Sequence, residues 1–270
     1  MTPTLLLAAI LAGAEPAEAV KSFEGSYSDA IAKGASKKVL LFVDFYTDWC
    51  GWCKVLDQKV YTDAVVAEVL NGKFVPMKIN AEKGEGKDLQ KEFKVTGFPT
   101  SVIIDPQTKK EVDRIVGYAP PEKYLEMLKK ILAGDTFAAL CKMAQDNPKD
   151  LEIWAKYADV LEGRGERDEI KAAWKKVADL DPDGSKGKAP QALFALARIA
   201  AMEKQSLAPV IEFAQKNEGK PVALEAHRLV TMWLERSKKE EDKKLQAASF
   251  EYLITHGARD PEIPPPGQLS

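Results

Sequence analysis

Two cysteines separated by two residues are the clearest chemical feature of this sequence. Cys50 and Cys53 occur in the run Trp-Cys-Gly-Trp-Cys that begins at Trp49. A pair at this spacing can be half of a zinc site, a static disulfide, or a dithiol that exchanges with its disulfide. A structural zinc site needs more ligands, and the only other cysteine is Cys141, while the first histidine is His227. The spacing favours redox exchange, in which Cys53 attacks a mixed disulfide formed on Cys50 within one helical turn.

A strand and a helix are predicted on either side of this pair. Residues 39–46 form a continuous apolar run interrupted by Asp44, which is typical of a strand buried on both faces. A helix that begins directly after Cys50 would point its free N–H groups and its dipole at that sulfur and stabilise a thiolate. A carboxyl inside an apolar strand has a raised pKa and can relay a proton, or it can pair with Lys78. These two interpretations of Asp44 are compatible, and we expect both.

The first half of the chain alternates strand-like and helical patterns, and the second half is helical throughout. Alternation predicts a mixed central sheet flanked by helices, which is an α/β fold. Residues 135–256 show no strand pattern, and breaks at Gly, Pro, Asn and Ser positions divide them into five to seven helices. In the first half, strands are predicted at 39–46, 74–79, 100–105 and 111–116, and helices at 26–35, 51–71, 85–94 and 121–133.

The segment 22–133 resembles the thioredoxin superfamily. The run from Val43 to Cys50 is similar to the strand and active-site entry of that family, and Gly97-Phe98-Pro99-Thr100 is similar to its second signature. The resemblance implies a thioredoxin-like fold and a thiol–disulfide oxidoreductase activity that needs no cofactor. It also implies a cis bond before Pro99 that faces the cysteines, which leaves the backbone of Phe98 to pair with an extended substrate segment. The implied catalytic residues are Cys50, Cys53, Asp44 and Lys78, and the implied substrate contacts are Trp49, Gly51, Trp52, Phe98, Pro99 and Thr100.

Departures from thioredoxin itself refine the resemblance. Gly51 and Trp52 stand between the cysteines where thioredoxin has Gly-Pro, and the helix after Cys53 lacks the proline that kinks it in thioredoxin. The stretch 56–75 is more similar to the C-terminal thioredoxin-like domain of bacterial transmembrane disulfide reductases and to related exported proteins. This similarity implies a reductant of disulfides in exported proteins, supplied with electrons by an upstream thiol donor.

The N-terminus has the pattern of a secretory signal peptide. An apolar run at 5–12 is followed by Ala17-Glu18-Ala19, a small-x-small cleavage pattern, so the mature chain is predicted to begin at Val20. No Lys or Arg precedes the run, and the alternative is a disordered or loosely helical tail. Export to the periplasm is the favoured interpretation. No later segment is apolar over the ~20 residues that a bilayer span needs, so we expect no integral membrane segment in the mature chain.

The helical half contains a spacing that is typical of tetratricopeptide repeats. Pro148 and Pro182 each end a helical pattern and are 34 residues apart, which matches the period of that repeat. The run Trp154 to Leu161 is similar to the first helix of the repeat, and the alternative is a plain helical bundle. A protein or peptide partner is expected on this half. The predicted organisation is a signal peptide at 1–19, a thioredoxin-like domain at 20–133, an all-helical domain at 134–258 and a Pro-rich disordered tail at 259–270.

Large side chains at helical spacing predict the core of this second half. Trp154, Trp174 and Trp233 have apolar neighbours one helical turn away and are expected to be buried. Cys141 lies on an amphipathic pattern and is expected to be a small core residue, since free cysteine is among the most buried residue types.

Charge and composition exclude several functions. Lys and Arg number 39 against 41 Asp and Glu, and the pI of about 5.9 gives no electrostatic basis for binding nucleic acid. Two histidines and three cysteines are too few for a disulfide scaffold or a histidine-built metal centre. The competing hypotheses are an adaptor, in which the helical array binds a partner and the first domain is an accessory or redox sensor, and metal handling by the cysteine pair. The sequence favours the enzyme because both cysteines, the buried acid and the Pro99 signature are all present.

Overall fold

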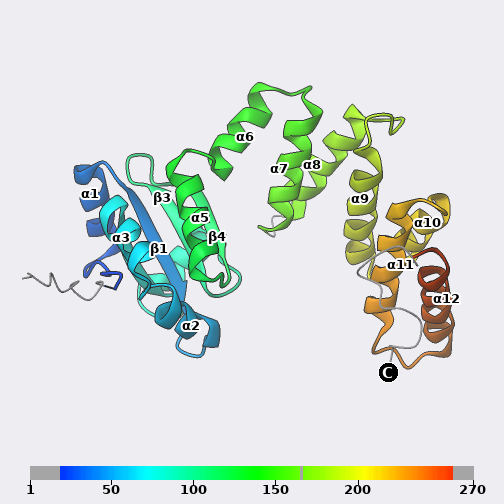
Figure 1. Cartoon of the computed structure of the whole chain (residues 1–270), viewed down its shortest axis with the longest axis horizontal. Helices are drawn as coiled ribbons and strands as arrows, with labels where there is room; N and C mark the ends of the chain where they lie inside the picture. The colour runs from blue at the N-terminus through cyan, green and yellow to red at the C-terminus, as the bar shows by residue number, and fades with distance from the viewer. Residues whose placement is uncertain (1–18, 165–166, 258–270) are drawn as a thin grey trace, which may run out of the picture. The chain divides into compact units, whose positions relative to one another are not determined.

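The computed structural model describes residues 19–164 and 167–257 (Figure 1). The chain divides into two compact units, one ending at Leu140 and the other beginning at Cys141, so the division falls within helix α6 (Phe137–Asp146). The predicted tail at 259–270 lies outside the described residues, as does the predicted signal peptide apart from Ala19. No helix in the described part of the chain is long and apolar enough to cross a membrane.

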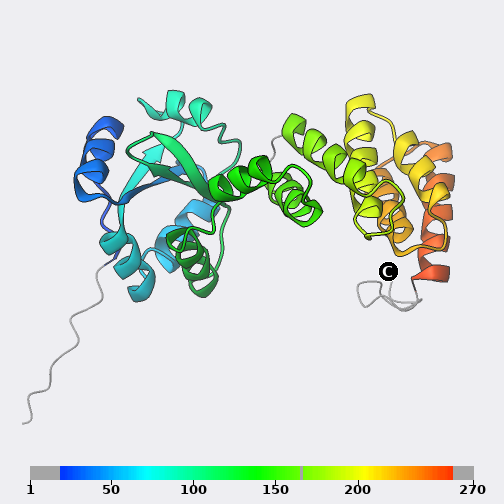
Figure 2. The same ribbon diagram turned by 90° about the horizontal axis from the view of Figure 1, so that it is seen from above.

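The first unit is a mixed four-stranded sheet with helices on both faces, as the alternating pattern predicts. The strand order is β2-β1-β3-β4, with β1 and β2 parallel and the other neighbours antiparallel. Helices α1 and α4 lie on one side of the sheet, and α2, α3 and α5 lie on the other (Figure 2). Their side chains form one core on each face. The elements are α1 (Tyr27–Lys37), β1 (Leu40–Tyr46), α2 (Gly51–Lys59), α3 (Ala64–Lys73), β2 (Phe74–Asn80), α4 (Gly86–Glu92), β3 (Thr100–Asp105), β4 (Lys110–Val116) and α5 (Pro121–Leu132).

Strand β1 lies in the interior of the sheet and supplies side chains to both cores. Val43 and Phe45 pack with α1 and α4, whereas Phe42 packs with α2, α3 and α5. Because side chains alternate along a strand, Asp44 lies on the same face as Phe42, beneath helix α2. Asp44 is 1% exposed, so the acid within the apolar run is buried as predicted.

The single helix predicted at 51–71 is wrong, because two helices occupy this stretch. Helix α2 ends at Lys59, and Asp63 begins α3 by accepting hydrogen bonds from the backbone N–H groups of Val65 and Val66, each at 3.0 Å. A capping aspartate satisfies N–H groups that have no partner inside the helix, which fixes a new start. The break turns Tyr61 into the core beside β1, where it is 5% exposed.

The second unit is helical throughout its described residues. Its helices pack in sequence, each against its neighbour along the chain from α7 to α12. The tetratricopeptide assignment of these helices stays a prediction. The elements are α7 (Leu151–Glu162), α8 (Arg167–Leu180), α9 (Ala189–Lys204), α10 (Ala208–Lys216), α11 (Pro221–Leu234) and α12 (Glu240–His256).

The predicted core of this unit is correct for Trp174 and wrong for Trp233. Trp174 is 1% exposed, but Trp233 is 41% exposed because the buried stripe of α11 runs through its neighbour Leu234. Trp154 is half-buried. Cys141 is also half-buried rather than a core residue, and its Sγ lies 3.9 Å from the Tyr157 hydroxyl.

Trp174 gives a direct test of this core. Its indole N–H donates to Glu162 Oε1 at 2.8 Å, so truncation removes both the packed ring and a hydrogen bond. We expect Trp174→Ala to lower the free energy of unfolding by ~3–5 kcal/mol. Urea denaturation followed by far-UV circular dichroism measures the change, and Trp233→Ala is the matched control with an expected loss below ~1 kcal/mol. Equal losses in the two variants would contradict the burial pattern.

Candidate active site

Cys50 and Cys53 form a disulfide at the N-terminus of helix α2. Cys50 is the N-cap residue, and its Sγ accepts a hydrogen bond from the backbone N–H of Cys53 at 3.1 Å. The cysteine residues are 4% and 3% exposed, but the indoles of Trp49 and Trp52 beside them are 68% and 61% exposed. When the bond is reduced, the helix N–H groups and dipole stabilise a thiolate on Cys50. The N-cap position therefore favours Cys50 as the nucleophile, with Cys53 as the second thiol.

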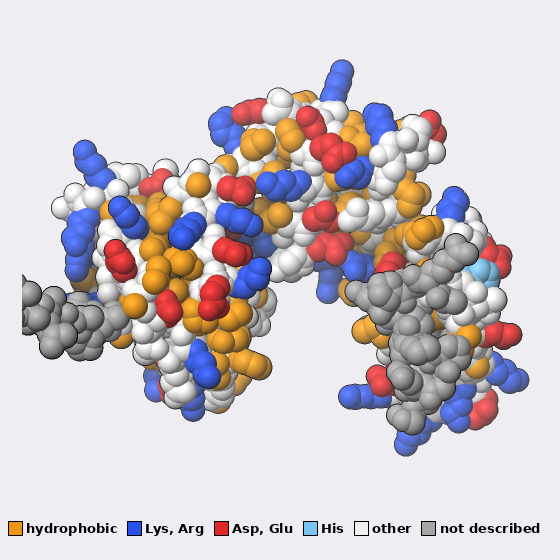
Figure 3. Space-filling view, in the orientation of Figure 1, with side chains coloured by type: hydrophobic (Ala, Val, Ile, Leu, Met, Phe, Trp, Pro, Cys, Tyr) orange, Lys and Arg blue, Asp and Glu red, His pale blue; other side chains and the backbone are white. Residues whose placement is uncertain are grey.

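Aromatic side chains surround this pair. Trp49 donates to Glu82 Oε1 at 3.1 Å and meets the ring of Phe98 edge to face at 6.0 Å between centroids. Trp52 stacks on Tyr118 with centroids 5.4 Å apart. Hydrophobic side chains also gather at the end of this unit that carries α2 (Figure 3). An apolar surface next to a reactive sulfur can hold the side chains of a protein substrate.

Tyr118 is a residue that the sequence analysis missed. It follows the end of β4, and the antiparallel register places the β4 residue Val116 opposite Thr100 of β3. Gly117 N–H then donates to Pro99 O at 2.8 Å, which brings the two loops together. The signal in the sequence is an aromatic residue that comes shortly after the predicted strand at 111–116. That strand forms a predicted hairpin with the strand that begins directly after Pro99. The result is a cavity of about 280 Å³ lined by Trp52, Phe98, Pro99, Gly117 and Tyr118.

The predicted second signature forms the loop before β3. The Phe98–Pro99 peptide bond is cis. Thr100 is buried and its hydroxyl donates to Gly97 O at 2.8 Å, so this side chain holds the loop rather than facing a substrate. Within the described residues, the backbone N–H and C=O of Phe98 make no hydrogen bond. Gly51 is exposed at the first position of α2.

The sheet register places Asp44 next to two polar side chains. Asp44 is paired with Lys78 of β2 on one side and with Ser101 of β3 on the other, and directly opposed residues share a face. Lys78 Nζ is 3.9 Å from Asp44 Oδ2, and the Ser101 hydroxyl donates to Asp44 Oδ1 at 3.4 Å. Ser101 also exchanges a hydrogen bond with Tyr124 at 2.8 Å. The buried carboxyl therefore lies within a polar network inside an apolar core.

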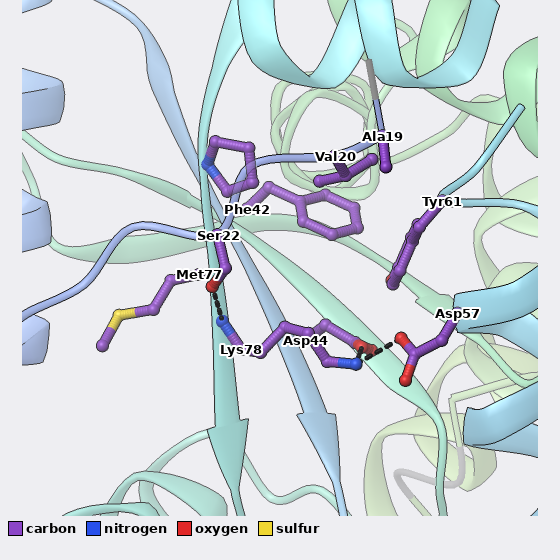
Figure 4. Close-up of a pocket in the computed structure, with 10 residues that line it drawn as sticks. Ala19, Val20, Ser22, Phe42, Asp44, Asp57, Tyr61, Met77 and Lys78 are labelled. Carbon is purple, nitrogen blue, oxygen red and sulfur yellow. Dashed lines mark hydrogen bonds and ion pairs between the residues drawn. The ribbon is translucent and has the colours of Figure 1, made fainter. Parts of the chain in front are cut away.

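Lys78 has a second and closer carboxylate partner, Asp57, which the sequence analysis missed. Asp57 follows Cys53 by four residues on α2, so both side chains lie on the same face of the helix. Its Oδ1 bonds Lys78 Nζ at a shorter distance than Asp44 does. Figure 4 shows Lys78 between Asp44 and Asp57. The expected pairing of Asp44 with Lys78 is present, but Lys78 also pairs with Asp57. The signal for Asp57 in the sequence is its spacing of four residues from Cys53.

Burial controls the charge of Asp44. The pKa of Asp44 is raised to about 7, mainly because the carboxyl is removed from water. Of the nearby charges, the Lys78 ammonium lowers this pKa and the Asp57 carboxylate raises it. Burial also raises the pKa of Tyr61 and of Tyr124, so both phenols remain hydrogen-bond donors at neutral pH. A carboxyl that titrates near pH 7 can both accept and return a proton under physiological conditions. This property suits a proton relay in the core beneath helix α2.

Comparison with known proteins identifies the domain that carries this site. A family model described as a thioredoxin-like domain matches residues 27–132. Residues 27–132 are a thioredoxin-like domain. The assignment agrees with the mixed sheet and with the disulfide at the start of α2. Among the described residues, no group of three or more His, Cys, Asp or Glu side chains is placed to hold a metal ion.

Relatives of the thioredoxin-like domain include thiol–disulfide proteins from plants and bacteria. Protein disulfide isomerase-like 5-3 of Oryza sativa is 38% identical over 107 residues, which cover 40% of this chain and 23% of that protein. The thiol:disulfide interchange protein DsbD of Ralstonia nicotianae is 30% identical over 93 residues, covering 34% of this chain and 15% of that protein. The solution structure of a putative disulphide-isomerase from Bacteroides thetaiotaomicron is 37% identical, with a TM-score of 0.39, and covers 44% of this chain and 94% of that one. The chain thus spans less than a quarter of these two curated relatives.

Proposed function

We propose that this chain is a thiol–disulfide oxidoreductase that reduces disulfides in exported proteins. The observation that carries the proposal is the Cys50–Cys53 disulfide at a helix N-terminus, with Asp44 buried beneath the same helix. The names of the relatives, disulfide isomerase and thiol:disulfide interchange protein, support this class of reaction. The signal-peptide pattern at 1–19 supports export to the periplasm.

The proposed reaction transfers two electrons from the reduced cysteine pair to a substrate disulfide. The Cys50 thiolate attacks one substrate sulfur, a Cys50–substrate bond forms, and the first substrate thiolate leaves. Cys53 then gives its proton to the Asp44 carboxylate and attacks Cys50 Sγ. The Cys50–Cys53 bond forms, the mixed disulfide breaks, and the second substrate thiolate leaves and takes up a proton.

The pair ends oxidised, as in the structure, and the substrate ends as a dithiol. The cysteines carry the electrons, so the step uses no cofactor, and an upstream thiol donor restores the dithiol.

Lys78 and Asp57 have supporting roles in this proposal. The Lys78 ammonium lies beside both carboxylates and offsets part of the repulsion between them. It thereby keeps the pKa of Asp44 near neutral rather than higher. The helical unit is proposed to bind a partner, either a substrate protein or a peptide segment of one.

The cavity between Trp52 and Tyr118 is proposed to hold an apolar side chain of the substrate. Loss of the stacked indole removes ~0.5–1.5 kcal/mol of aromatic contact. We therefore expect Trp52→Ala to raise KM for a protein disulfide by about 3- to 10-fold, with little change in kcat. Steady-state kinetics measure the change, and Val65→Ala, which truncates an exposed apolar side chain on α3, is the control. An unchanged KM would exclude this cavity from substrate contact.

Thiol transfer is the direct test of the proposed function. The reduced chain is mixed with an oxidised protein that contains disulfides, and the thiols of both proteins are counted after separation. We expect thiols lost from the Cys50–Cys53 pair to equal thiols gained by the substrate. No transfer with any protein disulfide, while the pair still reacts with dithiothreitol, would overturn the proposal.

A further inference from the structure

A short N-terminal segment outside the thioredoxin-like match lies along the outer edge of the sheet. We call residues 20–23, which begin the predicted mature chain, the strap. Val20 N–H donates to Tyr61 O at 2.8 Å, and Phe23 N–H donates to Pro76 O at 2.6 Å. Ser22 Oγ accepts the backbone N–H of Lys78 at 3.1 Å, which occupies a donor of the edge strand β2. These bonds fix the strap to the strand that carries Lys78.

Asn71 of helix α3 holds the strap from the other side. Its Oδ1 accepts the backbone N–H of Lys21 at 2.8 Å. Its Nδ2 donates to Ala19 O at 3.2 Å, a bond that cleavage before Val20 removes. The bond to Lys21 N–H remains in the predicted mature chain and holds the strap to α3. Asn71 is not among the residues that line the cavity described next.

The strap forms one wall of the cavity that contains the buried acid. This cavity has a volume of about 190 Å³, and Figure 4 shows the strap residues on one side and the charged residues on the other. Val20 also packs against the core that contains Phe42 and Tyr61. The lining combines Ala19 and two strap residues with residues of β1, β2, α2 and the turn after α2: Ala19, Val20, Ser22, Phe42, Asp44, Asp57, Tyr61, Pro76, Met77 and Lys78.

We propose that the strap is a positioning element of the active site, which closes the Asp44 cavity on one side and holds the Lys78 strand in register through Ser22. The proposal deepens the proposed function, because it concerns the proton relay of that same reaction. Water that enters such a cavity stabilises a carboxylate more than a carboxylic acid. A closed strap therefore keeps the Asp44 proton available near neutral pH, and a loosened strap would release it at lower pH.

The other groups that face Asp44 come from the folded domain and not from the strap. They are Lys78 on β2, Asp57 on α2, Tyr61 after α2, Ser101 on β3 and Tyr124 on α5. A variant that loosens only the strap leaves each of these side chains in place. A change in the titration of Asp44 in such a variant then reports on closure of the cavity.

The test uses two strap variants of the full chain in its oxidised form. Asn71→Ala removes the side-chain bond to Lys21 N–H, and the double variant Asn71→Ala/Ser22→Ala also removes the bond to Lys78 N–H. The ¹³C signal of the Asp44 carboxyl is followed against pH by NMR. We expect its midpoint to fall by about one pH unit in the double variant and by less in Asn71→Ala. Asn147→Ala, which removes an exposed asparagine bond in the second unit, is the control with no expected shift.

A midpoint in the double variant equal to that of the wild-type chain would overturn the strap proposal. This readout does not depend on activity, so the two proposals fail separately. If the wild-type chain transfers thiols but the midpoint does not move, only the strap proposal is wrong. If the midpoint moves but the chain transfers no thiols, the strap controls the cavity and the proposed function is wrong. In active protein, the pH profile of thiol transfer should move in the same direction as the midpoint.

Discussion

Replacing Cys53 with serine should turn the protein into a trap for its substrates. Cys50 retains the helix N-terminus that stabilises its thiolate, so it still attacks a substrate disulfide. Serine cannot resolve the mixed disulfide, because its hydroxyl does not displace a thiolate at neutral pH. We expect a covalent 1:1 adduct between Cys53→Ser and a protein substrate, which dithiothreitol releases. Non-reducing electrophoresis and intact-mass spectrometry measure it.

Two further variants make this prediction specific. Cys50→Ser removes the nucleophile and should give no adduct, with thiol transfer at the uncatalysed rate. Cys141→Ser removes the free cysteine of the second unit and should leave both adduct and transfer unchanged. Adducts that form equally in Cys50→Ser would mean that either thiol can attack, and adducts in Cys50→Ser alone would reverse the assigned roles.

Replacing Asp44 with asparagine should stabilise the oxidised protein at alkaline pH. The pKa of Asp44 is raised from 3.8 to about 7 in the folded state, so folding is favoured when this carboxyl is protonated. The sign follows from linkage. The contribution of the protonated Asp44 carboxyl to the free energy of unfolding is fully present below about pH 4, and it is lost as the pH rises to about 7. The shift corresponds to a loss of about 4 kcal/mol across that window. The Asp44→Asn variant has no carboxyl to titrate at this position, so its free energy of unfolding should not fall across the same pH range.

Urea denaturation of the oxidised chain between pH 4 and pH 8 measures this difference. Asp88→Asn, an exposed change on helix α4, is the matched control and should follow the wild-type profile. The same Asp44→Asn substitution should slow the second step of thiol transfer by about 10²-fold, because no carboxylate accepts the Cys53 proton. A parallel pH dependence in wild type and Asp44→Asn would show that Asp44 is not buried as described.

The sheet could be predicted from the sequence because its central strand has an unusual pattern. The run at 39–46 is apolar on both faces, and only a strand with helices on each side requires this. The break between α2 and α3 could not be predicted from periodicity. Val60 and Tyr61 continue the apolar spacing of a helix, and only the capping bonds of Asp63 reveal the new start. In α11 the same spacing included Trp233, although the buried stripe passes through Leu234.

The site could be predicted where its residues are close in sequence or carry a known signature. Cys50, Cys53 and Asp44 lie within one strand–helix unit, so their proximity follows from local structure. The partner of Lys78 could not be predicted in the same way. The spacing from Cys53 places Asp57 on the same face of α2, but the closer approach of Asp57 than of Asp44 to Lys78 depends on how α2 lies over the sheet.

The cavities depend on longer-range packing. Tyr118 meets Trp52 only because β3 and β4 pair in one register, and the strap reaches Lys78 only because it lies along β2. Each of these contacts joins segments that are tens of residues apart in the chain. The geometry of the cysteine pair is therefore local, whereas the proposed substrate contact and proton control depend on the fold.

The central claim is that this chain is a reductant of protein disulfides. The most direct test of this claim is the reduction potential of the Cys50–Cys53 couple. The chain is equilibrated with glutathione or dithiothreitol at set ratios, and fluorescence from Trp49 and Trp52 reports the oxidised fraction. We predict a value near the thioredoxin potential of about −270 mV, at which the dithiol donates electrons to disulfides of higher potential, such as strained or exposed ones. A value near about −120 mV would contradict this prediction, because the pair would then oxidise the thiols of folding proteins.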